Sequence, residues 1–194
     1  MKLQGKRVTL RQLVPEDFPQ WTEVRQRCRN WLVLWEPSKL SNLSDPDTDL
    51  KAFQQRCQFM QQEREKATGY SFGVFTDGQL IGEMNMSSVM GHPFYSCYVG
   101  YWIDQKQAGQ SYASEALAAV LRFGFEECLL YRIQVAIVPK NNASLRVVEK
   151  LGIPKEGIAR KFLEINGNWE DHQIFAMTIE DWEQKQETLI KDWL

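Results

Sequence analysis

The chain has 194 residues, of which 43% are hydrophobic, which is enough for one well-filled globular domain and too little for two full ones. Its 23 Lys and Arg residues against 25 Asp and Glu residues give a formal charge of -2, which excludes an overall positive field for nonspecific nucleic-acid binding. Its first residues lack the apolar core of a signal peptide, and no apolar run is long enough to cross a bilayer. We therefore expect a cytoplasmic protein without membrane contact.

The first half of the chain alternates between strand and helix patterns. It predicts a strand at 8–13, a helix from Pro15 to about Arg29, a second helix opened by Asp45-Pro46-Asp47, and strands at 70–76 and 79–88. Asp77-Gly78 between the last two is a typical hairpin turn.

The second half continues the alternation. It predicts a strand at 95–103, helices at 112–128 and 141–151, a short strand at 132–138, a hairpin of 158–165 and 172–177 around Asn166-Gly167, and a last amphipathic helix at 179–194. The resulting order, β-α-α-β-β-β-α-β-α-β-β-α, predicts an α/β fold with a mixed sheet flanked by helices. We expect a single domain over 1–194, with the last helix as an extension.

The four cysteines are isolated from one another. They form no C-x-x-C pair and have no adjacent histidine, so we expect free thiols and no metal site at Cys28, Cys57, Cys97 and Cys128. A thiol enzyme built on Cys97 is an open alternative, although nothing local activates that thiol.

The loop between the predicted strand at 95–103 and the helix at 112–128 is rich in small residues. Free amides at a helix N-terminus favour a phosphate, and small residues let it approach the backbone. An ordinary strand-to-helix turn at Gly109 is the alternative. The loop carries neither the Walker pattern nor a three-glycine dinucleotide fingerprint.

Two motifs carry a resemblance to a known family. The stretch Ala108-Gly109-Gln110-Ser111-Tyr112-Ala113 resembles the coenzyme A-binding motif [QR]-x-x-G-x-[GA] of the GNAT acetyltransferases, with Ala108 and Ser111 in place of its first and central positions. Residues 139–157 are similar to the family's N-x-x-S-x-x-x-x-E-K-x-G-F-x-x-E-G run and depart from it chiefly at Ile153. The resemblance implies the GNAT fold, with a mostly antiparallel sheet, and acetyl-CoA as cosubstrate.

Three further segments resemble the RimJ/RimL branch of this family: Trp35-Glu36-Pro37, 97–101 and 157–172. This resemblance implies an N-acetyltransferase that acts on the N-terminal α-amine of a ribosomal protein, RimJ enzymes acting on alanine, and it allows association with the ribosome. Acetylation of a small amine, such as a polyamine or an aminoglycoside, is an alternative. A noncatalytic module that binds acyl-CoA or the ribosome is another.

The family's site positions can be carried over residue by residue. The resemblance implies cofactor contacts at Tyr101, Trp102, Ile103, Ala108, Gly109, Gln110, Ser111, Tyr112, Ala113, Ser114 and Asn141. It makes Ser144 the candidate proton donor to the leaving thiolate, as in RimL-like enzymes. The positions of the RimI tyrosine, the RimI base and the RimL acid fall at Val148, Ala136 and Leu163, so none of those roles transfers.

The remaining candidates rest on residue chemistry. Glu83, on the strand before the loop, is the candidate base if it faces the groove. Trp35, Glu36 and Asp171 are candidate acceptor-binding residues, with surface ion pairs as the alternative for the two acids. His172 is expected to be structural. Ser111 keeps a backbone N–H for a pyrophosphate if its backbone angles are not glycine-like.

Overall fold

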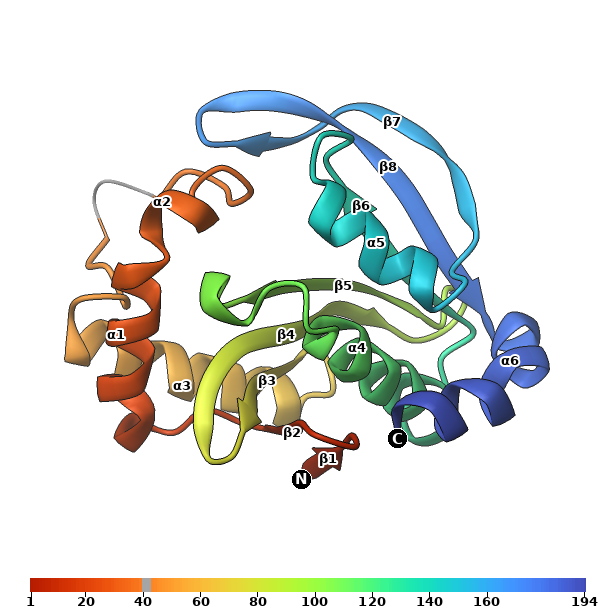
Figure 1. Cartoon of the computed structure of the whole chain (residues 1–194), viewed down its shortest axis with the longest axis horizontal. Coiled ribbons are helices and arrows are strands. Elements are labelled where there is room, and N and C mark those ends of the chain that lie inside the picture. Colours follow the sequence, from red (N-terminus) through yellow and green to blue (C-terminus); the bar gives the residue numbers. More distant parts are fainter. Residues whose placement is uncertain (40–42) are drawn as a thin grey trace.

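A computed structural model describes residues 1–39 and 43–194, and in this part of the chain one sheet of eight strands forms the framework (Figure 1). The strands lie in the spatial order β1-β2-β3-β4-β5-β6-β8-β7. Adjacent strands are antiparallel except for the parallel pair β5 and β6. The strands are β1 (Lys2–Gln4), β2 (Thr9–Arg11), β3 (Tyr70–Thr76), β4 (Gln79–Met90), β5 (Ser96–Ile103), β6 (Arg132–Ile137), β7 (Lys155–Ile165) and β8 (Asn168–Thr178).

Helices fill the connections between the strands. They are η1 (Pro15–Asp17), α1 (Phe18–Arg27), α2 (Arg29–Leu32), α3 (Leu50–Glu65), η2 (Gln105–Gln107), α4 (Tyr112–Arg122), η3 (Phe123–Glu127), α5 (Asn142–Lys150) and α6 (Ile179–Trp193). Polar side chains cap several of their N-termini. Asp49 accepts a hydrogen bond from Ala52 N at 2.9 Å, and Thr178 forms a capping box with Asp181.

Two larger hydrophobic cores hold the helices on the sheet, beside a small third cluster of Val24, Cys28 and Leu32. In the larger core, Leu117 of α4 and Trp182 of α6 pack with buried side chains of the central strands, such as Met84. In the second core, Trp21 of α1 and Phe53 of α3 pack with side chains of the β3–β4 hairpin. Because the side chains of a strand alternate between faces, Glu83 and Met84 point to opposite sides of the sheet.

The parting of β5 from β6 is the feature that shapes the centre of the molecule. The two strands pair only over Ser96–Tyr98 of β5 and Arg132–Gln134 of β6, whereas β5 stays paired with β4 as far as Ile103. Beyond Tyr98, the β6 edge of β5 therefore has no strand partner. Figure 1 shows the sheet opening there, with α5 between β5 and the β7–β8 hairpin.

The predicted α/β class and the mixed, mostly antiparallel sheet are confirmed. The predicted element order lacks β1 and α2, which are only three and four residues long and too short for a periodic pattern. The second helix begins at Leu50 rather than near Asp45, because Asp49 has an extended backbone and its side chain caps the helix by accepting a hydrogen bond from Ala52 N. β7 begins three residues before the predicted 158–165, and β8 begins four residues before the predicted 172–177 and ends one residue after it.

The last helix is more than an extension. Trp182 and Leu189 of α6 are 2% and 5% exposed and belong to the larger core, where Trp182 stacks on Phe125 with 5.7 Å between ring centroids. Removing α6 would uncover the core residues packed against these side chains, such as Phe125, so the helix is part of the fold. Within residues 1–39 and 43–194, no helix combines the length and apolar character needed to span a membrane.

Glu115 joins the first turn of α4 to the N-terminal hairpin. Its carboxylate is 1% exposed, accepts a hydrogen bond from Val8 N at 2.9 Å and from Arg7 N, and pairs with the Arg7 guanidinium at 2.9 Å. A Cβ on Gly5 would lie 2.7 Å from Glu115 Oε1, so only glycine fits beside this carboxylate. Glu115 therefore fixes the N-terminus of α4 against β2.

We expect Glu115→Ala to lower the free energy of unfolding by about 3 kcal/mol, because two backbone N–H groups lose their acceptor in a buried site. Urea unfolding followed by circular dichroism measures this change. Glu126→Ala is the matched control, since Glu126 forms an exposed pair with Arg122 on the same helical segment and should cost less than about 1 kcal/mol. Equal effects of the two substitutions would contradict the role of Glu115.

Candidate active site

A groove of about 390 Å³ runs along the opening between β5 and α5 and ends beneath the segment that follows α2. It brings together most of the predicted site residues, although they are separated by up to 109 positions from Trp35 to Ser144. Those that line it are Trp35, Glu36, Tyr101, Trp102, Ile103, Ala108, Gly109, Ser111, Tyr112, Ala113, Ser114, Asn141 and Ser144. Gln110, Glu83 and Asp171 are outside this lining.

One end of the groove is built to hold an anion. Gly109 has φ +83° and Ser111 has φ +68°, and together they turn the chain so that the first turn of α4 faces the groove. The backbone N–H groups of that turn have no partner within the helix, and the helix dipole is positive there. The Ser114 hydroxyl is buried beside them and has no hydrogen-bond partner among the described residues.

Ser111 adopts a backbone conformation that suits glycine. Its φ of +68° and ψ of +10° are left-handed, so the condition that its backbone angles are not glycine-like is not met. Its hydroxyl accepts a hydrogen bond of 2.6 Å from Lys150 Nζ at the end of α5. Serine is therefore strained at the position where the family motif has glycine.

The middle of the groove is formed by the start of α5. The Asn141 side chain accepts a hydrogen bond from Ser144 N at 3.1 Å and so caps the helix while also lining the groove. Tyr101 OH donates to Ser144 O at 3.1 Å, and burial raises the pKa of Tyr101. The Ser144 hydroxyl has no hydrogen-bond partner among the described residues, which leaves it available to a bound molecule.

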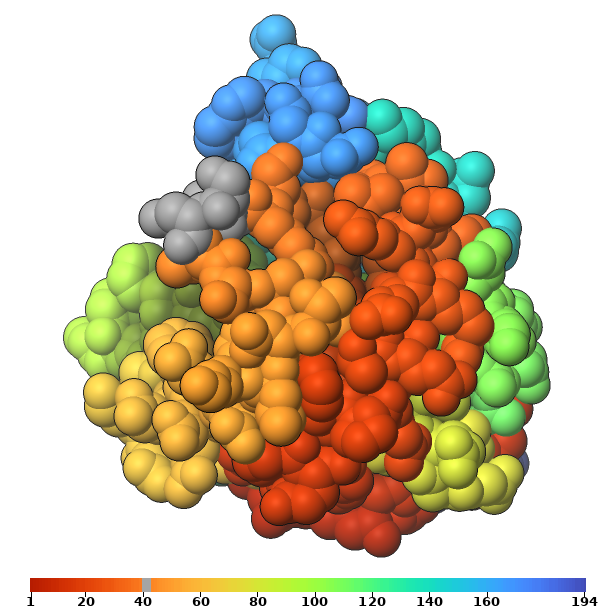
Figure 2. Space-filling view, turned by 90° about the vertical axis from the view of Figure 1, so that its left-hand side faces the viewer, coloured from red at the N-terminus to blue at the C-terminus, as the bar shows by residue number. Residues whose placement is uncertain are grey.

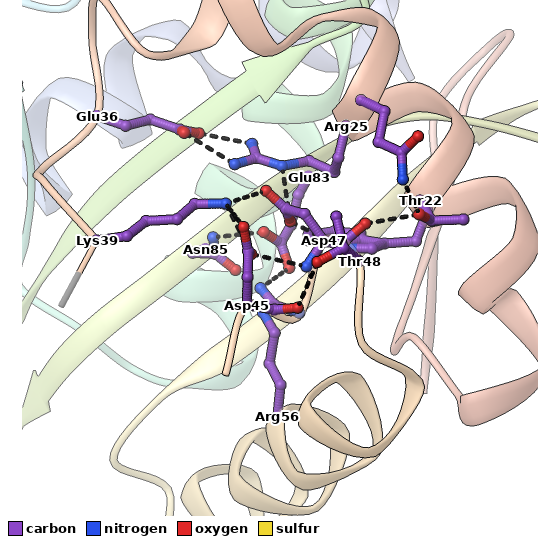
Figure 3. Close-up of polar contacts among 12 residues, drawn as sticks. Thr22, Arg25, Glu36, Lys39, Asp45, Asp47, Thr48, Arg56, Glu83 and Asn85 are labelled. Carbon is purple, nitrogen blue, oxygen red and sulfur yellow. Dashed lines mark hydrogen bonds and ion pairs between the residues drawn. The ribbon is translucent and has the colours of Figure 1, made fainter. Parts of the chain in front are cut away.

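The other end of the groove is covered by the segment after α2. The Arg25 guanidinium, with a side chain 9% exposed, makes two hydrogen bonds of 2.6 and 2.8 Å to Glu36 and one of 3.0 Å to Asp47 (Figure 3). It also lies over the Trp102 ring at 5.0 Å. Burial alone would lower the pKa of Arg25, but Glu36 and Asp47 raise it overall. Arg25 therefore holds Glu36 and Trp102 in fixed positions in the groove wall.

The tip of the β7–β8 hairpin closes over the same segment. Asn166 N donates to Glu36 O at 3.0 Å, and Ser38 Oγ donates to Glu164 Oε1 at 2.8 Å. Figure 2 shows the blue hairpin resting against the orange segment that follows α2. Residues from both ends of the chain thus form one rim.

Glu83 and Asp171 have other partners. Glu83 is 3% exposed, pairs with Arg56 and accepts a hydrogen bond from Asn85 Nδ2 at 3.1 Å, so Asn85 and not Glu83 reaches the groove wall (Figure 3). Asp171 accepts a hydrogen bond from Lys161 N at 2.9 Å within the hairpin. The condition that Glu83 faces the groove is not met.

Several groove residues were not predicted. Arg146 and Lys150 lie one helical turn apart on α5 and bring two positive charges to the anion-binding end. Their i, i+4 spacing on a predicted helix places them on one face, and this could have indicated from the sequence that both charges reach the same site. Trp31 and Asn85 had no such signal, because α2 is too short to predict and the partners of Asn85 come from distant segments.

The cysteines offer no nucleophile in the groove. Burial raises the pKa of the Cys97 thiol to about 12, and the thiolate is the reactive form. Among the residues that the structure describes, no group of three His, Cys, Asp or Glu side chains is placed to hold a metal ion.

Comparisons with known proteins agree with this geometry. The family described as an acetyltransferase (GNAT) domain matches residues 7–153. The chain is 30% identical over 184 residues to the [Ribosomal protein uS5]-alanine N-acetyltransferase of Escherichia coli, covering 94% of this chain and 93% of that protein. It is 40% identical over 126 residues to the probable N-acetyltransferase YjcK of Bacillus subtilis, covering 64% and 70%. The structure of Mycobacterium smegmatis RimJ in complex with CoA-disulfide superposes with a TM-score of 0.91 at 25% identity, covering 99% and 94%.

We expect Ser111→Gly to raise the free energy of unfolding by about 1 kcal/mol, because glycine adopts a left-handed backbone without a Cβ penalty. Titration with acetyl-CoA should give an unchanged or lower dissociation constant, since the exposed hydrogen bond from Lys150 contributes little. Ser111→Val is the opposite control and should destabilise the protein, because a β-branched residue is poorly accommodated at this φ. Weaker binding by the glycine variant would show that the serine hydroxyl itself contacts the ligand.

Proposed function

The chain belongs to the GNAT acetyltransferase family, and from this premise we propose that it acetylates the N-terminal α-amine of a protein, with alanine of a ribosomal protein as the acceptor. It is an acetyl-CoA-dependent N-acetyltransferase. The observation that supports this acceptor is the groove itself, which joins an anion-binding helix terminus to a rim containing Glu36. Ribosomal proteins are made in the cytoplasm, so the proposal also locates the enzyme there.

The residues at the α4 end fit the pyrophosphate of coenzyme A. The amides of Gly109 and of Tyr112 to Ser114 lie at the anion-binding end, the buried Ser114 hydroxyl supplies an additional donor, and Arg146 and Lys150 supply positive charge. Asn141 lies farther along the groove, where the family's motif contacts the pantetheine arm. Acetyl-CoA supplies the activated acyl group, and the unpaired edge of β5 near Trp102 and Ile103 offers backbone donors for the acyl oxygen.

Charge at the other end of the groove favours a cationic acceptor. The cluster around Arg25 contains the carboxylates of Glu36, Asp45, Asp47 and Glu83 and the cations Arg25, Lys39 and Arg56, so one negative charge is in excess. Glu36 is the member that lines the groove. We propose that Glu36 and Trp35 receive the acceptor's N-terminus, with association with the ribosome bringing the substrate near.

The chemistry of the amine also favours an α-amine. An α-amine with a reference pKa near 8 is neutral in about a tenth of molecules at pH 7, whereas a lysine amine near 10.4 is neutral in about one in a few thousand. Only the neutral amine attacks the thioester. Because Glu83 lies outside the groove lining and is paired with Arg56, it does not supply a carboxylate base there, and the groove is better suited to an α-amine than to lysine.

An amine panel tests the proposed acceptor. The purified protein should release thiol from acetyl-CoA in the presence of a peptide that begins with alanine, and mass spectrometry should place the acetyl group on the α-amine. The same peptide with a blocked N-terminus and an internal lysine is the control and should not react. Turnover only on a polyamine or aminoglycoside would overturn the proposed acceptor, and binding of acetyl-CoA without turnover on any amine would favour a noncatalytic module.

Ser144 is proposed to donate a proton to the leaving thiolate. We expect Ser144→Ala to lower kcat by about 10² to 10⁴-fold, the usual contribution of a positioned acid, with the dissociation constant for acetyl-CoA unchanged. Steady-state kinetics and calorimetry measure the two quantities. Ser87→Ala is the matched control, because Ser87 is exposed on β4 away from the groove. An unchanged kcat for Ser144→Ala would remove Ser144 from the mechanism.

A further inference from the structure

His172 lies at a second cavity that continues the groove. This cavity has a volume of about 150 Å³ and is situated in the opening between β5 and β6. It shares Tyr101, Asn141 and Ser144 with the groove, and His172 of β8 lines its far side. His172 is only 2% exposed, so the cavity is its main access to a bound molecule.

The His172 ring is held in one orientation and one tautomer. Its Nδ1 lies 3.0 Å from Glu170 O, and a carbonyl oxygen only accepts hydrogen bonds, so Nδ1 carries the proton. The Phe162 ring packs against it edge to face at 5.5 Å. Nε2 has no hydrogen-bond partner among the described residues and is absent from their buried unpartnered atoms, so in a ring that lines the cavity it is the nitrogen left free to accept a proton.

The other titratable groups around the groove and the cavity are unsuited to accept a proton. Arg146 and Lys150 are cations, and Glu36 is bound by Arg25 through two hydrogen bonds. Tyr101, on the strand opposite His172, is a hydrogen-bond donor, and Tyr112 lies at the anion-binding end. The Glu170 carboxylate pairs with Lys140 at 2.7 Å, and Asp171 is held by Lys161 N.

Resting on the proposed function, we propose that His172 is the general base of the transfer, reached from the acceptor amine through water in the cavity between β5 and β6. The amine nitrogen forms a bond to the acyl carbon as the carbon–sulfur bond breaks, and the proton lost by the nitrogen passes to His172 Nε2. Ser144 protonates the leaving thiolate, and the imidazolium returns a proton to Ser144. A cavity of this size has room for the water that links these groups.

The substitution His172→Asn tests this role. Asparagine retains a donor near the position of Nδ1, so the hydrogen bond to Glu170 O can persist while the base at Nε2 is removed. We expect kcat to fall by about 10² to 10⁴-fold, with the affinity for acetyl-CoA unchanged. His92→Asn is the control, since His92 is the other of two histidines and is exposed.

The protonation of the two His172 ring nitrogens can also be tested without measuring turnover. Nitrogen NMR of the resting protein should show His172 protonated at Nδ1 and unprotonated at Nε2, and the Nε2–H tautomer would overturn the proposal. If His172→Asn fails to fold by circular dichroism, His172→Gln replaces it, with the same expected loss. A kcat for either folded variant within about threefold of the native value would also overturn the proposal.

Failure of this inference can be told apart from failure of the proposed acceptor. The native protein and both histidine variants are assayed on the alanine peptide and on the small amines. If only a small amine reacts, the α-amine proposal is wrong, and His172 is judged by the loss of kcat on that amine. If the peptide reacts equally well with the native protein and the folded His172 variant, the acceptor stands and the base is wrong.

Discussion

The separation of β5 from β6 is the constraint on which the rest of the site depends. Parallel strands that stop pairing inside a protein expose backbone N–H and C=O groups that need other partners. After Tyr98, the β6 edge of β5 has no strand partner, and the space beside it becomes the groove and the smaller cavity. A bound molecule that lies along this edge can take the place of a strand. The same opening sets α5 and β8 on its far side, so Ser144 and His172 reach one space.

Charge is distributed unevenly along this opening. Arg146, Lys150 and the N-terminus of α4 make one end positive, whereas the excess carboxylate around Arg25 makes the other end negative. This distribution of charge suits the proposed placement of an anionic cosubstrate and a cationic acceptor at opposite ends of one groove. Arg25 keeps this arrangement rigid because it holds Glu36, Asp47 and the Trp102 ring at once.

The residues predicted to bind the cofactor could be proposed from the sequence because they lie close together in the chain. Gly109 to Ser114 and Asn141 to Ser144 each belong to one strand-to-helix or loop-to-helix connection, and each motif predicts its own local geometry. The opposite end of the groove is assembled from separate segments, which supply Arg25, Glu36, Asn85 and the tip of the β7–β8 hairpin. Local patterns could not show that Glu83 forms an ion pair with Arg56 or that Asp171 accepts a hydrogen bond from Lys161 N.

The sequence by itself determined the α/β class, most of the strands and helices, and the family, because hydrophobic periodicity and turn residues act over a few positions. The structure, not the sequence, showed that Ser111 is left-handed and that the Asn141 side chain caps α5. Only the tertiary structure decided which acids and bases face the groove. Whether Glu83 or His172 is available depends on ion pairs and hydrogen bonds made across the sheet, and a side chain's partners are set by packing rather than by its neighbours in the chain.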